Sequence, residues 1–231
     1  MGRDVNTGVQ DVHNLAWKIA AVLHGEADES LLDSYHRERQ PLATITTQNA
    51  LANAMSMGRT ERRAGVLPRR EFLNEQGLIF GASYESSAII PDGTPAAVLA
   101  DPVTEYLPSA RPGSRAPHVW LKRGDAQISA IDLIGPHFLL LAGADGDAWR
   151  HAAKAAAPSW PPLIAHTIGI DSEVSDPDSQ WQPAYGVDAD GAVLVRPDGY
   201  VAWRNRSGAS NPEAALRTAF DRLLGRVPAV A

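Results

Sequence analysis

The N-terminal part of the chain repeats its apolar positions with the period of an α-helix. Between Val9 and Leu23 apolar residues recur every three or four positions. The residues that share one helical face are Val9, Val12, Ala16, Ile19, Ala20 and Leu23. Thr7 and Gln10 have the spacing of a capping box, and Gly25 is placed to end the helix. The pattern predicts an amphipathic helix that starts at a cap on Thr7.

Two more helical segments follow. Ser30 and Asp33 have the spacing of a second capping box, which predicts a helix through LLDSYHRERQ. Pro41 either ends this helix or opens a third one, because proline lacks the amide that an interior position needs. The third segment, LATITTQNALANAMSM, ends at Gly58. The chain therefore begins with a helical region of residues 1–58.

The amino-acid composition is different from residue 59 to residue 111. The stretch RTERRAGVLPRR is charged and interrupted by proline, and residues 77–111 are rich in Pro, Gly and small side chains. Such a composition is typical of an irregular connector. We expect a domain boundary within it.

Beyond residue 112 the pattern is that of short strands. Apolar or alternating runs occur in HVWL, QISAIDL, HFLLLAG and LIAHTIGI, and GDAWRHAAKAAA before Pro158 has a helical pattern. GAVLV and YVAWR flank an RPDG turn. The closing helix has Asn211 as its cap, Pro212 at its first position and Gly225 at its end. Strand, helix, strand, hairpin and helix is the order of a thioredoxin-like domain.

Composition and charge exclude several classes of protein. The 231 residues include 21 Lys and Arg against 27 Asp and Glu, a formal charge of −6, and no basic stripe that would follow a phosphate backbone. We therefore expect no nucleic-acid partner. No apolar stretch approaches the roughly 18 residues that span a bilayer, and the N-terminus lacks a signal pattern, so we expect no membrane contact and a cytoplasmic protein.

The candidate chemistry is sparse. The chain has no cysteine, which excludes disulfides, a cysteine nucleophile and the CxxC pair of a redox-active thioredoxin. His13, His24 and His36 do not have the spacing of metal ligands. HExxH, GxSxG and GxGxxG are all absent. The residues thus assign no catalytic side chain and no metal site.

Two N-terminal stretches nevertheless resemble a segment of a known protein family. GRDVNTGVQDVHNLAWKIAAVLHG and LLDSYHRERQP resemble the segment that closes the flavin site in the class A flavin-dependent aromatic hydroxylases, in the phenol and polyketide branch. APHVWL, IDLIGPHFLLLAG and YGVDADGAVLVRPDGYVAWR are similar to the strands of that family's C-terminal domain. The resemblance implies an α/β chain with a helical remnant of the FAD and substrate domain (1–58), a Pro/Gly-rich connector (59–111) and a thioredoxin-like domain without cysteines (112–231).

The resemblance also implies a flavin contact. Val5 and Asn6 would offer backbone amides to the ring of FAD, Gly2 and Asp4 would shape the turn, and Thr7 would cap the helix. A helix N-terminus favours the negative charge of a reduced flavin. Because the GxGxxG loop for the FAD pyrophosphate is absent, we do not expect tight FAD binding by this chain alone.

Three functions stay open at this point. The chain is the C-terminal part, or a truncated homologue, of a monooxygenase that uses FAD, NAD(P)H and oxygen to hydroxylate an aromatic or polyketide substrate, and is inactive alone. Alternatively it is a non-catalytic subunit that forms homo-oligomers or docks on a separate FAD-domain subunit through the exposed face of the first helix. The third reading is a cofactor-free cyclase or ligand-binding protein, whose sign would be an apolar cavity lined by the three N-terminal helices.

Overall fold

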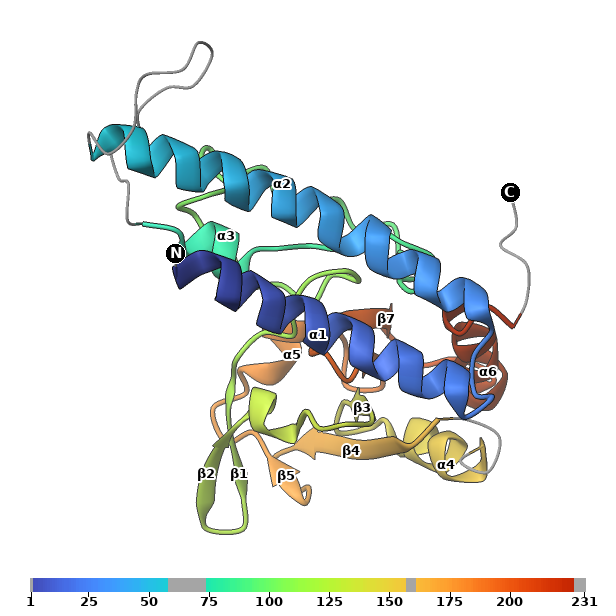
Figure 1. Ribbon diagram of the computed structural model, residues 1–231. Coiled ribbons are helices and arrows are strands. Elements are labelled where there is room, and N and C mark those ends of the chain that lie inside the picture. Colours follow the sequence, from blue (N-terminus) through green and yellow to red (C-terminus); the bar gives the residue numbers. More distant parts are fainter. Residues whose placement is uncertain (1, 58–73, 157–160, 227–231) are drawn as a thin grey trace.

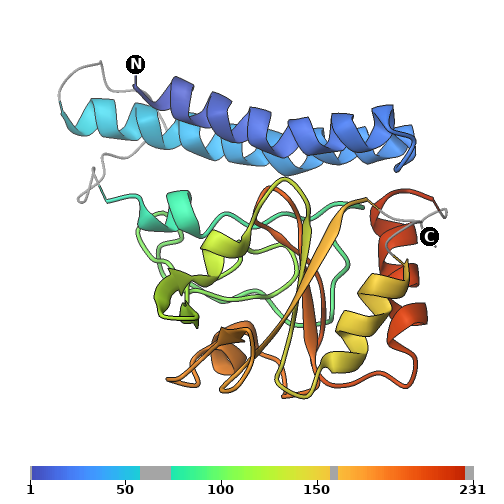
Figure 2. The ribbon, with the colours of Figure 1, turned by 90° about the horizontal axis from the view of Figure 1, so that it is seen from below.

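A layer of two long helices packs on an α/β unit (Figures 1 and 2). The computed structural model describes residues 2–57, 74–156 and 161–226. α1 (Gly2–Leu23) and α2 (Asp33–Ser56) lie side by side and are joined by a short 3-10 helix, η1 (Glu29–Leu32). Figure 2 shows both helices on one side of the molecule, with the sheet and the remaining helices on the other.

α1 begins earlier than the sequence predicts. Its helical residues start at Gly2, so Thr7 lies inside the helix and the predicted cap at Thr7 is wrong. Residues 2–6 contain no proline, so the backbone hydrogen bonds of the helix extend through them. The N-terminal cap of η1 is likewise Asp28, whose carboxylate accepts from the Ser30 amide, and α2 starts at Asp33.

α2 is a single helix where the sequence predicts a break. It runs from Asp33 to Ser56 with Pro41 inside it, so neither predicted outcome for Pro41 is correct. Proline leaves the carbonyl four residues earlier, that of Arg37, without its helical partner. Arg37 is exposed, so water can satisfy this carbonyl, while Glu38 and Arg39 on the same turn are buried in tertiary contacts that hold the helix together.

The described residues form a mixed seven-stranded sheet in the order β2-β1-β5-β4-β3-β6-β7. β3 pairs in parallel with β4 and antiparallel with β6. The strands are β1 (Trp120–Arg123), β2 (Ala126–Ser129), β3 (Phe138–Ala142), β4 (Leu163–Gly169), β5 (Val174–Ser175), β6 (Ala192–Val195) and β7 (Val201–Asn205). The remaining helices are α3 (Gln76–Phe80), η2 (Ala130–Leu133), α4 (Asp147–Ala156), α5 (Trp181–Tyr185) and α6 (Pro212–Leu223).

The central strand β3 divides the core into two halves, because successive side chains of a strand point to opposite faces. Phe138, Leu140 and Ala142 face α4 and α6, and this half also contains Trp17 of α1. Leu139 and Leu141 face the other half, which contains α5. All five residues of β3 are buried, as expected for a strand covered on both faces.

The α/β unit has the thioredoxin-like order. β3, α4 and β4 form the strand, helix and parallel strand, and the β6–β7 hairpin and α6 complete it. The caps of α6 are confirmed: the Asn211 side chain accepts from the Ala214 amide, Pro212 is at the first turn and Gly225 has a left-handed backbone. The sequence analysis did not predict β5 or α5, which are short, with α5 buried through Trp181 and Tyr185.

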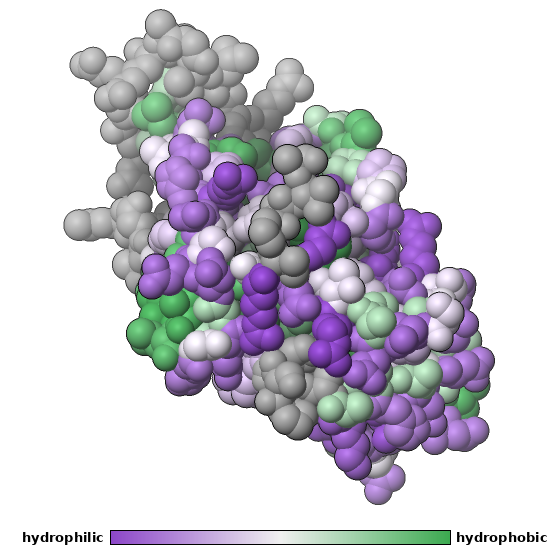
Figure 3. Space-filling model, turned by 90° about the vertical axis from the view of Figure 1, so that its right-hand side faces the viewer, coloured by the Kyte–Doolittle hydropathy of each residue, from purple (hydrophilic) through white to green (hydrophobic). Residues whose placement is uncertain are grey.

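The connector is mostly irregular where it is described. The Ile90 amide of the connector donates to the Ala202 carbonyl of β7, and just beyond the connector the Gly113 amide donates to the Val201 carbonyl. The charged stretch 59–70 and the predicted helix ends at Gly58 and Pro158 lie outside the described residues. The end of the molecule at α6 has a mainly hydrophilic surface (Figure 3). Of the helices described, none is long and apolar enough to cross a membrane.

Candidate functional site

A buried ion pair joins the helical layer to the α/β unit. Glu38 comes from the second turn of α2, and Arg196 comes from the RPDG turn between β6 and β7. The two terminal nitrogens of Arg196 donate to the two carboxylate oxygens of Glu38, at 2.7 and 2.9 Å. Both side chains have no exposed surface. A bidentate pair of this kind fixes the orientation of one layer on the other.

α1 contributes two further polar groups to the same cluster. Lys18 donates to Glu38 at 2.8 Å and to the side-chain oxygen of Asn14 at 2.9 Å. Asn14 in turn donates to Glu38 at 2.7 Å and to Asp198 at 3.2 Å. Asp198 also accepts two hydrogen bonds from Arg196, so the cluster holds two positive and two negative charges. We call Asn14, Lys18, Glu38, Arg196 and Asp198 the seam cluster.

The seam cluster is balanced electrostatically. Burial alone would raise the pKa of Glu38, but the charges and hydrogen bonds of Arg196 and Lys18 outweigh it and lower the pKa to about 2. For Lys18, burial and the neighbouring charge of Arg196 outweigh Glu38 and Asp198 and lower the pKa to about 8. At neutral pH Glu38 is therefore a carboxylate and Lys18 still carries its proton.

Aromatic rings enclose the cluster. The Arg196 guanidinium carbon lies 5.1 Å from the ring centroid of Trp17 and 5.4 Å from that of Tyr84. Trp17 packs edge-on against Phe138 of β3, with ring centroids 5.5 Å apart. Cation–π contacts on the faces of Arg196 complement the carboxylates in its plane. The cluster is thus shielded from water, which strengthens each of its ionic contacts.

A second polar contact joins α1 to α2. Arg39 donates to Asp11 at 2.7 Å, to Gln10 at 3.2 Å and to the Tyr84 hydroxyl at 3.1 Å. Arg39 therefore acts as a clasp between the two helices. Gln10, which the sequence analysis assigned to a capping box, serves this clasp instead.

The buried face of α1 is not its apolar face. Val9, Val12 and Leu23 expose 64%, 67% and 79% of their surface, and the other members of the predicted stripe are exposed too. Asn14, Trp17, Lys18 and Ala21 face the α/β unit. The sequence analysis took RPDG for a simple hairpin turn and missed its role in the seam cluster. The available signal was Asn14 and Lys18, four residues apart on the helical face that carries Trp17.

The predicted flavin residues lie apart from the seam cluster. Gly2, Asp4, Val5, Asn6 and Thr7 occupy the first turns of α1, whereas the cluster begins about two turns further on at Asn14. The side chains of residues 2–5 are outside the described part, and Asn6 is exposed. In a helix that begins at Gly2 the unpaired amides belong to the first turn, so the Asn6 amide is used by the helix itself.

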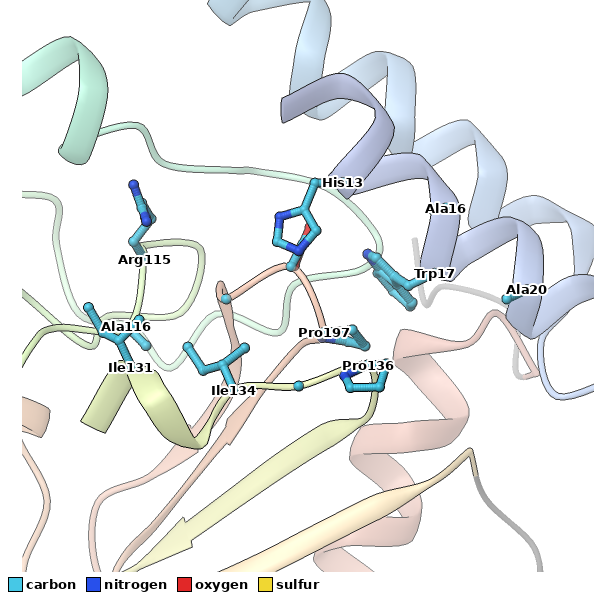
Figure 4. Close-up of a pocket in the computed structure, with 13 residues that line it drawn as sticks. His13, Ala16, Trp17, Ala20, Arg115, Ala116, Ile131, Ile134, Pro136 and Pro197 are labelled. Carbon is cyan, nitrogen blue, oxygen red and sulfur yellow. The ribbon is translucent and has the colours of Figure 1, made fainter. Parts of the chain in front are cut away.

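A pocket of about 590 Å³ opens at the same seam (Figure 4). Its walls come from α1 and from three loops of the α/β side, around Arg115, Pro136 and Pro197. Of the N-terminal helices only α1 lines this pocket, so it differs from the cavity that would mark the ligand-binding alternative. Across residues 2–57, 74–156 and 161–226, no three His, Asp or Glu side chains are grouped as a metal site.

Comparison with known proteins agrees with this architecture. Residues 109–227 match the family described as aromatic-ring hydroxylase, C-terminal, and residues 1–50 match an FAD binding domain. The chain is 40% identical to tetracenomycin A2 monooxygenase-dioxygenase of Streptomyces glaucescens, an alignment that covers 96% of this chain and 38% of that protein. It is 41% identical to 4-methyl-5-nitrocatechol 5-monooxygenase of a Burkholderia species, covering 96% and 40%.

A solved structure shows the same fold. Aklavinone-11 hydroxylase in a ternary complex with FAD and aklavinone superposes with a TM-score of 0.81 at 35% identity, over 96% of this chain and 40% of that one. The chain therefore belongs to the aromatic-ring hydroxylases and carries their C-terminal domain. It spans about two fifths of the length of the curated relatives it matches.

Proposed function

We propose that this chain acts as the C-terminal part of an FAD-dependent monooxygenase that hydroxylates an aromatic or polyketide substrate. The observation that carries the proposal is the composite nature of the chain. α1 and most of α2 match an FAD binding domain, and the seam cluster joins them to the C-terminal domain of the aromatic-ring hydroxylases. On this proposal α1 and α2 are part of the flavin domain, and they pack on the C-terminal domain.

The residues present fit only part of FAD. The start of α1 offers the unpaired amides and positive dipole end of a helix, which suit an electron-rich edge of the flavin ring. No GxGxxG loop for the pyrophosphate occurs in the 231 residues. FAD supplies the redox chemistry of such enzymes when it is bound. On this proposal Gly2, Asp4, Val5, Asn6 and Thr7 lie beside its ring, and the phosphates need residues from another part.

The exposed stripe of α1 supports the same proposal. Val9, Val12, Ile19 and Leu23 are large apolar side chains on one face of a helix, and all are exposed. Such a face is normally covered by protein. We propose that a phosphate-binding part of the flavin domain covers it, within one polypeptide or as a separate subunit. A homo-oligomer that buries the stripe is the competing arrangement.

A chimera tests this proposal. Joining the part of tetracenomycin A2 monooxygenase-dioxygenase that precedes its matched segment to residue 1 of this chain restores a full-length hydroxylase. We expect the purified chimera to hold about one FAD per chain and to oxidise NAD(P)H when a phenolic substrate is added. The measurements are the flavin absorbance per protein and the rate of NAD(P)H oxidation.

Matched substitutions make the chimera informative. Val12→Asp places a charge on the stripe and should lower the FAD content, because a buried unpaired carboxylate destabilises the domain interface. Val98→Asp, on the fully exposed Val98 of the connector, should leave it unchanged. A chimera that is folded by circular dichroism but holds no FAD would contradict the proposal.

A further inference from the structure

Two hollows meet at the seam between α1 and the α/β unit. The larger one, of about 590 Å³, has mainly apolar walls from Trp17, Ile131, Ile134, Pro136 and Pro197. The smaller one, of about 200 Å³, has polar walls that include Gln10, Asn14 and the rings of Tyr84 and Tyr200. His13, Arg115 and Asp198 line both hollows, so they stand where the two meet. Together the hollows fit a ligand with an apolar body and a polar head.

The polar groups at this junction favour a negative head. Asp198 is compensated, because Arg196 donates to both of its oxygens and Asn14 donates to one. Arg115 has no ion pair within the described residues. Its guanidinium donates a 3.5 Å hydrogen bond to the Ile79 carbonyl and lies 5.8 Å from the ring of Phe80, and its charge also acts on the Tyr106 and Tyr200 hydroxyls. Its charge is therefore left to attract an anion.

Trp17 adds an unused donor to the wall of the apolar hollow. Trp17 is 8% exposed, and its indole nitrogen, which is itself buried, has no hydrogen-bond partner among the described residues. Figure 4 shows the nitrogen at the end of the ring that is turned towards His13 and the pocket. A ligand oxygen that reaches this N–H after a small movement of the ring would supply the missing hydrogen bond.

We propose that this seam pocket binds a small aromatic carboxylate. The ring lies in the apolar hollow, and the carboxylate faces Arg115, His13 and the Trp17 indole N–H at the junction. A volume near 590 Å³ lies in the range of small-molecule sites and takes one or two fused rings. The walls come from both the helical layer and the α/β unit, so the site exists only while the seam is closed.

The seam pocket involves neither the flavin nor residues 2–7, so naphthoate binding is independent of the FAD content of the chimera. In the third alternative that the sequence leaves open, a ligand-binding protein, this pocket would be the binding site.

Binding can be measured on the 231-residue chain with 2-naphthoate as the probe. A ¹⁵N-labelled sample gives an indole N–H signal for each of its six tryptophans, and Trp17→Phe identifies the signal of Trp17 by its loss. We expect saturable binding in which the Trp17 indole signal shifts. The neutral isostere naphthalene-2-carboxamide should bind at least about tenfold more weakly, because it lacks the charge that Arg115 attracts.

Two arginine variants complete the test. Arg115→Met should weaken naphthoate binding about tenfold and leave carboxamide binding unchanged. Arg150→Met is the control, because Arg150 is an exposed residue of α4 that pairs with Asp147. Because Arg115 lies at the pocket wall and outside the buried core, its substitution should keep the fold, which calorimetric melting verifies.

Several results would overturn the proposal. One is the absence of saturable naphthoate binding below about 5 mM. Another is binding that shifts residues of the exposed α1 stripe and leaves the Trp17 indole signal in place. Equal affinity for the carboxylate and the carboxamide, or no effect of Arg115→Met, would also refute it.

Discussion

At the residue scale, the fold of this chain depends on a few charged side chains that the sequence pattern does not single out. Glu38 and Arg196 are 158 residues apart in sequence and pair with no exposed surface. Charged residues are rarely buried unless they are paired. A pattern of local periodicity cannot predict such a pair, because its partner is set by the way in which two distant elements pack.

Glu38→Gln should therefore be strongly destabilising. The substitution leaves Arg196 and Lys18 buried with one negative charge fewer, and breaking a buried ion pair costs about 3–5 kcal/mol. Urea unfolding followed by circular dichroism measures the loss. Glu213→Gln, which removes an exposed partner of Arg217 on α6, is the matched control and should change the free energy of unfolding by less than about 0.5 kcal/mol. Equal effects of the two substitutions would contradict the seam cluster as described.

The same carboxylate predicts an acid-sensitive stability. The pKa of Glu38 is about 2 in the folded chain against an ordinary 4.5, so its contribution is fully present above pH 4.5 and is lost as the pH falls towards 2. At about 1.4 kcal/mol per pH unit, the loss over this range is about 3 kcal/mol. The measurement is the free energy of unfolding in urea between pH 6 and pH 2. In Glu38→Gln the curve should be flatter by this amount, and an unchanged slope would argue against the assignment.

At the element scale, the sequence predicted the elements with strong local signals and missed those that tertiary contacts decide. The β6–β7 hairpin and the caps of α6 follow from Gly199, Asn211 and Pro212, residues with specific backbone preferences. The single helix α2 across Pro41 was not predictable in this way, because contacts of the preceding turn with α1 and the α/β unit override the local preference.

Pro41→Ala should accordingly stabilise the chain. Pro41 is exposed in the interior of α2, so alanine restores a backbone hydrogen bond without disturbing packing. Allowing for the greater freedom that alanine gives the unfolded chain, we expect a gain of about 2 kcal/mol. Thermal unfolding measures it. No gain, or a loss, would show that α2 needs the proline.

Gly113, two residues beyond the connector, tests how the end of the connector is held against the sheet. Its backbone angle φ is +95°, its amide donates to Val201 of β7, and its carbonyl accepts from the Tyr84 amide. A Cβ here would clash with the Tyr84 carbonyl oxygen, so Gly113→Ala should cost more than about 2 kcal/mol. Gly93→Ala is the control, since Gly93 also has a positive φ but faces open space, and should cost only about 1 kcal/mol. Similar costs at both sites would contradict this account of the connector.

At the scale of the whole molecule, the resemblance of the N-terminal stretches told more about function than any single residue. The sequence predicts the α/β class of the fold, the thioredoxin-like order of its elements and the hydroxylase family. The fold and the comparisons confirm all three. The flavin contacts of residues 2–7 remain a proposal. The exposed stripe of α1 is the face on which we propose that a phosphate-binding part of the flavin domain packs, because an apolar helix face is normally covered by protein.

The most direct test of the central claim is an FAD titration of the 231-residue chain beside the chimera, followed by quenching of flavin fluorescence. The chain contains the helix that we propose lies beside the flavin ring, but no pyrophosphate loop. We predict no saturable quenching by the chain below about 100 µM, and stoichiometric binding by the chimera. Saturation of the chain alone at micromolar FAD would contradict the account.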